Sequence, residues 1–182
     1  MPLLCSRWLV SVFAACTITS AAGADPQRRI INVSPQDDLA RIVDSAESGA
    51  TILLKDGVYK ISRPLAFRKP DVWMRSESGD RGRVVIDGKV GAGKLKRESC
   101  VNEVISIKSS NVTISDIGIC HARDHGIHIS GGKTGHTHNV IMRNVHIYDC
   151  GQQLIKVNSN GSKPLYWADE GILEDSLIEF RD

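Results

Sequence analysis

The chain has 182 residues, which is enough for one domain with a continuous core. Its formal charge is +2 and its 24% charged residues intersperse both signs, so composition gives no support to nucleic-acid binding. Aromatic residues make up 5% of the chain, which is low for a globular enzyme but normal for a solenoid with stacked aliphatic side chains inside.

Residues 1–24 have the pattern of a secretion signal. Arg7 supplies the positive charge, Trp8–Ile18 the apolar core, and Ala22–Ala24 a small-x-small cleavage site. The apolar run, at about 11 residues, is too short to span a bilayer, and no other segment could cross one. We therefore predict a secreted or periplasmic protein, with lipid attachment at Cys16 as the alternative interpretation.

A short linker, residues 25–33, leads to a helix predicted over residues 34–49. Ser34 resembles a helix cap, Pro35 suits the first helical position, and acidic residues follow in the first turn. Four apolar residues then share one face (Leu39, Ile42, Val43, Ala46). Such a helix is expected to cover the open first coil of a solenoid, whose strand edges would otherwise be bare.

A repeat organises the second half of the chain. The segment Asn111–Ile119 returns as Asn139–Ile147, at an offset of 28 (139 − 111), and a second apolar pair follows each copy. Apolar residues alternate within each copy, which is the period of a strand. A fixed period means that each unit stacks on its neighbour, so residues 50–182 are predicted to be all-β and to form a parallel β-helix. The alternative is a β-sandwich whose strands are similar by coincidence.

A family resemblance accompanies this pattern. The predicted helix, the strand Gly49–Leu54 and then Asp56–Tyr59 resemble the entry segment of secreted right-handed β-helix proteins of the pectin-lyase-like superfamily. Within it, the segment is most similar to the chondroitinase B and alginate lyase branch. The resemblance implies a right-handed parallel β-helix, but it specifies activity poorly because this fold serves lyases, hydrolases, epimerases and non-catalytic proteins.

Three connections lengthen along the chain, after the strands that end at Ile107, Ile129 and Val157. The repeat places them at one corner, where they should form a wall beside a surface groove. The sequence up to Asp182 contains no closing helix or polar coil. We therefore expect an uncapped C-terminal coil that is exposed, self-associates end to end, or continues in a longer protein of which this is a truncated piece.

Without the signal, three cysteines remain: Cys100, Cys120 and Cys150. An odd number leaves at least one thiol free or paired between chains. Cys120 and Cys150 lie on successive coils, so a bridge between them is geometrically possible, and an oxidising compartment permits it. None of the cysteine pairs has the spacing of metal ligands.

Candidate site residues follow from the repeat. Ser106, His128 and Lys156 are each flanked by inward aliphatic residues, so they should point outward on one face, one coil apart. A corner patch should lie beside them, together with a long loop that carries an aromatic side chain. The additional candidates are His121, Arg123, Asp124, His125, Asp149, Gln153 and Trp167.

These residue types suit an acidic polysaccharide, because Arg, Lys and His bind carboxylates through charge-assisted hydrogen bonds. Elimination from a uronate needs a base, for which Lys156 or His128 is suited, and a cation that stabilises the enolate, for which Arg123 is suited. Asp124 and Asp149 could hold Ca²⁺. The remaining candidates would contact substrate (His121, His125, Gln153, Trp167).

Two simpler interpretations stand beside this one. Outward polar ladders are found on any soluble solenoid, so the patch would then be only solvated. His136 and His138 could ligate a metal, but the sequence offers no third ligand. The prediction is therefore a secreted β-helix protein that binds an acidic polysaccharide or cleaves it by β-elimination. The alternative is a non-catalytic binding, adhesive or structural module, or an inactive fragment of a longer enzyme.

Overall fold

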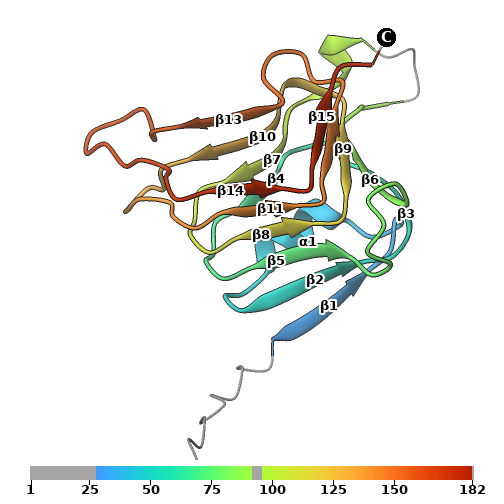
Figure 1. The fold of residues 1–182 in the computed structure, drawn as a ribbon, viewed down its shortest axis with the longest axis horizontal. Helices are drawn as coiled ribbons and strands as arrows, with labels where there is room; N and C mark the ends of the chain where they lie inside the picture. The colour runs from blue at the N-terminus through green and yellow to red at the C-terminus, as the bar shows by residue number, and fades with distance from the viewer. Residues whose placement is uncertain (1–27, 92–95, 182) are drawn as a thin grey trace, which may run out of the picture.

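The computed structural model describes residues 28–91 and 96–181. The predicted signal peptide, residues 1–24, lies outside the described residues. Almost all regular structure in the described part is β-strand, arranged in three parallel sheets (Figure 1). In these described segments, no helix is long and apolar enough to cross a membrane.

The chain visits the three sheets in turn, so that each circuit adds one strand to each sheet and lies on the circuit before it. In stacking order, sheet A contains β1 (Arg29–Val33), β2 (Ala50–Leu54), β5 (Trp73–Ser76), β8 (Thr113–Ser115), β11 (Ile141–Arg143) and β14 (Ile172–Glu174). Sheet B contains β3 (Gly57–Lys60), β6 (Val84–Asp87), β9 (Gly118–Cys120), β12 (His146–Tyr148) and β15 (Leu177–Glu179). Sheet C contains β4 (Leu65–Phe67), β7 (Val101–Ile107), β10 (Ala122–Ser130) and β13 (Ile155–Asn158).

The register of these strands follows the sequence repeat. Ile114 lies beside Met142, and Ile119 beside Ile147, which is the offset of 28 read from the repeated segments. Met142 in turn pairs with Leu173 on the next circuit. Inward residues therefore stack into aliphatic ladders that fill the interior, and the predicted parallel coils are confirmed.

The N-terminal end differs from the sequence prediction. Residues 29–33, expected to be linker, form β1, which pairs with β2 and starts sheet A one circuit early. The helix α1 spans only Leu39–Ser45 and packs against β4, so it occupies the place that a first strand of sheet C would take. The expected start at Ser34 is wrong because that residue binds the carboxylate of Asp37, whereas Asp38 caps the helix by accepting from the Arg41 N–H at 3.0 Å.

Corners of the coil are held by side-chain amides stacked one circuit apart. Asn139 donates to the Asn111 side chain at 3.0 Å, and Asn111 donates to Asp71 at 2.8 Å. All three have positive φ, a conformation that Asn and Asp tolerate better than most residues. The repeated asparagine is therefore a corner residue, with its amide shared between neighbouring circuits.

The last circuit exposes apolar side chains. The outermost strands β14 and β15 leave Leu173, Leu177 and Ile178 partly open to solvent, and Phe180 beyond them is 65% exposed. A cavity of about 290 Å³ opens at this end between Met142, the last strands and the loop before β14.

Candidate functional site

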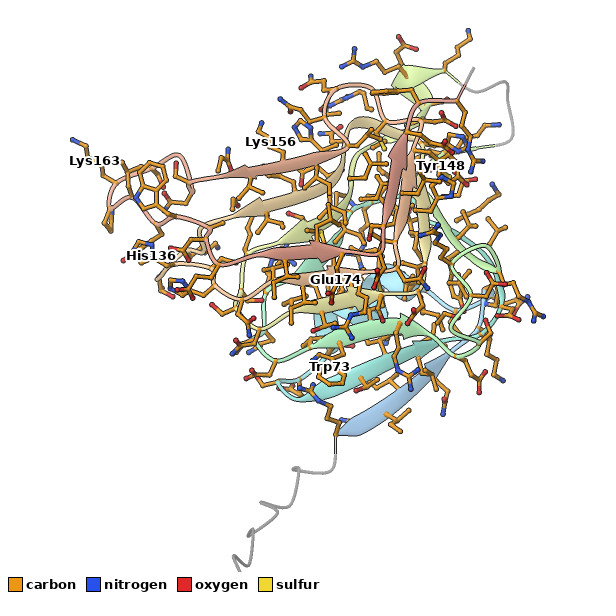
Figure 2. All side chains as sticks on the ribbon, in the orientation of Figure 1. Trp73, His136, Tyr148, Lys156, Lys163 and Glu174 are labelled. Carbon is orange, nitrogen blue, oxygen red and sulfur yellow. The ribbon has the colours of Figure 1, made fainter. Side chains whose placement is uncertain are left out.

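The outer face of sheet C carries a ladder of side chains from four successive circuits. Ala66 pairs with Ser106, Ser106 with His128, and His128 with Lys156. Their neighbours Ile127 and Ile129 are buried inside the coil, so the alternation of the strand turns the ladder outward. Lys156 lies on β13, at the end of the ladder (Figure 2).

A cavity of about 390 Å³ lies along the N-terminal part of this ladder. Three of its lining residues are cationic (Arg63, Arg68, Lys108). Arg63 and Arg68 both pair with Asp44 of α1, the latter at 2.8 Å, so the capping helix holds two of these cations in place. The other lining residues are Pro64, Ala66, Asn102, Glu103 and Ser106.

Glu103 fixes the imidazole of His128. The His128 Nδ1 lies 2.5 Å from the Glu103 carboxylate, and Nε2 lies 3.0 Å from the side-chain oxygen of Asn158. A carboxylate on one ring nitrogen is the usual device for orienting a histidine that exchanges a proton through the other. His128 is therefore held on the outer face of sheet C, with Nε2 directed toward Asn158 at the end of β13.

His125 and Lys156 form a second pair beside it. The Lys156 ammonium donates to His125 Nε2 at 3.3 Å, so the histidine proton sits on Nδ1, which is buried and has no hydrogen-bond partner among the described residues. Burial, and then the positive charge of Lys156, lower the pKa of His125 below its ordinary value. His125 is thus a neutral acceptor that directs Lys156 along the face.

The corner patch predicted from sequence divides into separate groups. Asp124 accepts from Arg97 at 3.3 Å and from Gln152 at 3.2 Å, and Arg123 lies 3.6 Å from its second oxygen. Asp149 instead accepts the Arg181 N–H at 2.9 Å.

Asp149 also lines a different cavity, of about 270 Å³. Across residues 28–91 and 96–181, neither Asp124 nor Asp149 belongs to a cluster of three metal-ligand side chains. The Ca²⁺ site proposed at these two residues therefore stays an untested prediction. Gln153 is exposed beside this corner.

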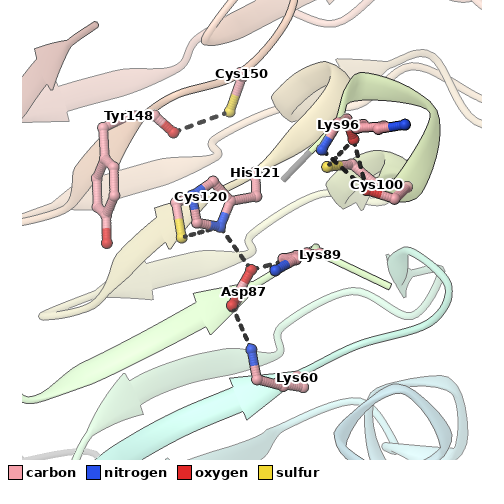
Figure 3. Close-up of polar contacts among 10 residues, drawn as sticks. Lys60, Asp87, Lys89, Lys96, Cys100, Cys120, His121, Tyr148 and Cys150 are labelled. Atoms are coloured by element: carbon pink, nitrogen blue, oxygen red, sulfur yellow. Dashed lines mark hydrogen bonds and ion pairs between the residues drawn. The ribbon is translucent and has the colours of Figure 1, made fainter. Parts of the chain in front are cut away.

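His121 turns toward sheet B. Its Nδ1 lies 2.8 Å from Asp87, whose other oxygen accepts from Lys60 at 2.7 Å (Figure 3). Burial alone would raise the pKa of the Asp87 carboxyl, but hydrogen bonds from Lys60, the Lys89 N–H and His121 together lower it. His121 therefore belongs to a different cluster from His125 and His128.

The three cysteines within the described residues, Cys100, Cys120 and Cys150, are buried free thiols. The bridge between Cys120 and Cys150, which the sequence left open, is not formed. Burial raises the pKa of the Cys120 thiol to about 12 and that of Cys150 to about 11.

The lengthening connections do form one wall between sheets C and A (Figure 1). Residues 131–140 and 159–171 are joined by a bridge between Thr137 and Ala168, and the Trp167 N–H donates to His136 Nδ1 at 3.0 Å. The Trp167 side chain is exposed. His138 pairs with Asp169 and lies close to Glu170, so the structure brings carboxylates to a histidine that has no such neighbour in the sequence.

Sequence reasoning missed Glu103, Asn158 and the three cations of the cavity. A signal for Glu103 was present, because the offset of 22 that aligns Ser106 with His128 also aligns Glu103 with His125 (125 − 103). Arg63 and Arg68 gave no signal, since they flank a strand that precedes the clear repeats.

Comparisons with known proteins support the fold. No family model matches the chain, and no curated protein does. The structure is similar to "Pectin methylesterase PemA from Erwinia chrysanthemi", with a TM-score of 0.52 and 14% identity, over 84% of this chain and 49% of that one. The chain therefore spans about half the length of that protein. At this identity the likeness shows the fold alone, and it confirms the predicted right-handed parallel β-helix.

Proposed function

We propose that the outer face of sheet C binds an acidic polysaccharide. The observation that carries the proposal is the continuity of this face, from the cationic cavity of Arg63, Arg68 and Lys108 to the ladder that ends at His128 and Lys156. Successive circuits are about 4.8 Å apart, so a polymer laid across them would meet Ser106, His128 and Lys156 in turn. Guanidinium and ammonium groups are the donors that carboxylates prefer.

We propose further that the bound polymer is cleaved by β-elimination. In this step His128 would act as a neutral imidazole whose proton stays on Nδ1, held by Glu103. Its unprotonated Nε2, turned away from the Asn158 side-chain oxygen, would remove the proton next to the uronate carboxylate. The electron pair of the broken C–H bond forms the new double bond, and the glycosidic oxygen leaves with a proton from solvent. Lys156 would neutralise the carboxylate, a role in which it replaces Arg123, because Arg123 lies against Asp124.

Two further features fit this proposal. A polysaccharide outside the cell is reached by a protein exported through the signal predicted at residues 1–24. The exposed ring of Trp167, on the loop wall, would stack on a sugar. The pectin methylesterase with a similar fold acts, by its name, on a pectin, which makes pectate a sensible first polymer to test.

Binding and cleavage are tested separately. Binding to pectate, alginate and chondroitin sulfate is measured by affinity electrophoresis, and elimination by the ultraviolet absorbance of unsaturated uronate. Lys156→Met should weaken binding, whereas Lys55→Met, an exposed lysine outside sheet C, should not. Glu103→Gln and His128→Asn should abolish product formation while weakening binding less than Lys156→Met does.

The outcomes separate the alternatives. Binding that needs Lys156 without any product would leave a non-catalytic carbohydrate-binding module. This second function is favoured by one observation, that both ring nitrogens of His128 and Nε2 of His125 already have partners. A folded protein that binds none of the three polymers, with or without added Ca²⁺, would refute the proposed function.

A further inference from the structure

A second cluster of reactive side chains lies on sheet B. Asp87 ends β6, Cys120 ends β9 directly beside it, and His121 follows Cys120 at the corner. One carboxylate oxygen, the thiol sulfur and one ring nitrogen all lie within 4.8 Å of one another (Figure 3). The strand register therefore places three different metal-ligand groups around one point.

The contacts within the cluster are already close to those of a coordination shell. His121 Nδ1 lies 2.8 Å from Asp87 Oδ1 and 3.4 Å from Cys120 Sγ. Ligand atoms at about 2.0–2.3 Å from a tetrahedral ion lie roughly 3.3–3.8 Å apart. The sulfur–nitrogen separation fits this range, and the oxygen–nitrogen separation is about half an ångström shorter than its lower end.

The backbone conformation of His121 directs its imidazole toward the cluster. His121 has a φ of 60°, a left-handed conformation that at the comparable corner of the next circuit is taken by Asp149. An Asp or Asn would satisfy this backbone as well as a histidine does. Histidine at this position adds an imidazole directed at Asp87, which the turn itself does not require.

The surroundings also match a metal centre. Asp87 is 7% exposed and Cys120 is 2% exposed, so two of the three ligand groups are shielded from solvent, while His121 is partly exposed. Lys60 donates to Asp87 Oδ2 and the Lys89 N–H donates to Oδ1, which orients the carboxylate from outside the cluster as second-layer partners do in metalloproteins.

We propose that Asp87, Cys120 and His121 bind a single divalent transition-metal ion of the zinc class. A mixed sulfur, nitrogen and oxygen set selects Zn²⁺ or Co²⁺ over Ca²⁺ and Mg²⁺, which prefer oxygen ligands alone. On binding, Cys120 releases its thiol proton to solvent and the sulfur bonds to the ion, while the His121 proton moves from Nδ1 to Nε2. The negative charges of the Asp87 carboxylate and the Cys120 thiolate then balance the two positive charges of the ion, and Lys60 keeps its hydrogen bond to Asp87.

The test is a Co²⁺ titration of the full chain under reducing conditions, with Cys5→Ser and Cys16→Ser to remove the thiols of the predicted signal. We expect one equivalent of Co²⁺ to bind, with a near-ultraviolet absorption band from thiolate-to-cobalt charge transfer. Cys120→Ser should abolish this band, and His121→Asn, which keeps the corner conformation, should weaken Co²⁺ binding by more than the roughly 10–100-fold that loss of an outer-shell partner costs.

Cys150→Ser is the matched control. Cys150 is also a buried free thiol, but its sulfur donates to the Tyr148 carbonyl and belongs to no ligand cluster within the described residues. This variant should keep the full charge-transfer band, with circular dichroism confirming the fold of each protein. A folded parent without the band, or a band that survives Cys120→Ser, would overturn the proposal, which does not depend on the function proposed for sheet C.

Discussion

Because equivalent circuits stack, isoleucines of the same ladder should contribute to stability according to how deeply they are buried. Ile119 lies between Ile86 and Ile147 in the sheet B ladder and is 0% exposed, whereas Ile178 ends the same ladder and is 39% exposed. Truncation to alanine removes the same three carbons at both positions. Any difference in the free energy of unfolding therefore measures how well each side chain is enclosed.

The magnitudes follow from burial. At Ile119, the three carbons contribute about 2.4 kcal/mol at ~0.8 kcal/mol each, and the closed cavity raises the loss to roughly 3–4 kcal/mol. Ile178 is already partly hydrated and its removal leaves an open space, so the loss should be about 1 kcal/mol.

Urea denaturation followed by circular dichroism measures both values, with the slope m checked to be the same in each protein. A difference of roughly 2 kcal/mol or more is expected between Ile119→Ala and Ile178→Ala. Equal losses, or a larger loss at Ile178, would refute the enclosed ladder.

Three further predictions concern ionisable groups and the last circuit. The lowered pKa of His125 means that the unfolded chain binds a proton near pH 6.5 while the folded chain does not. The free energy of unfolding should therefore fall as the pH drops from 6.5 toward the folded pKa, by at most ~1.4 kcal/mol per pH unit from this residue. His125→Gln should reduce that pH dependence, and an unchanged dependence contradicts the assignment. Because burial raises the pKa of Cys120 and Cys150, both thiols should react with a disulfide reagent only after denaturant is added; rapid labelling of the native protein would show that they are accessible. The exposed apolar side chains of the last circuit should associate with those of a second copy, so sedimentation velocity should detect dimers that Leu173→Lys and Phe180→Ser weaken; a monomer at all concentrations would rule this out.

The sequence predicted the strands best where inward residues repeat without interruption. Asn111 and Asn139 begin equivalent corners, and the apolar pairs after each recur at the same offset, so the register of sheets A and B could be counted directly. The strand at residues 29–33 could not be found this way, because the helix that follows it breaks the series. The helix start was predicted too early, at Ser34, because this residue could cap a helix but instead hydrogen-bonds to the carboxylate of Asp37 in its own turn.

The candidate site was predictable along sheet C and not at its corner. His128 and Lys156 follow strict alternation, so their common face was evident from spacing. Between Ala122 and His125 the register against β7 shifts by one residue, and His121 has a left-handed backbone. A bulge and a corner with left-handed backbone turn side chains in directions that a two-residue period cannot describe, which is why His121 separates from Arg123 and Asp124.

The connections at the corner between sheets C and A become longer along the chain. The connections from sheet C to sheet A cover residues 108–112, then 131–140, then 159–171, while the strands on either side keep their neighbours. Segments of different length or chemistry can therefore be exchanged at this corner without changing which strands pair. Specificity for a ligand and stability of the scaffold are thus separable, so binding surfaces could be redesigned here on an unaltered framework.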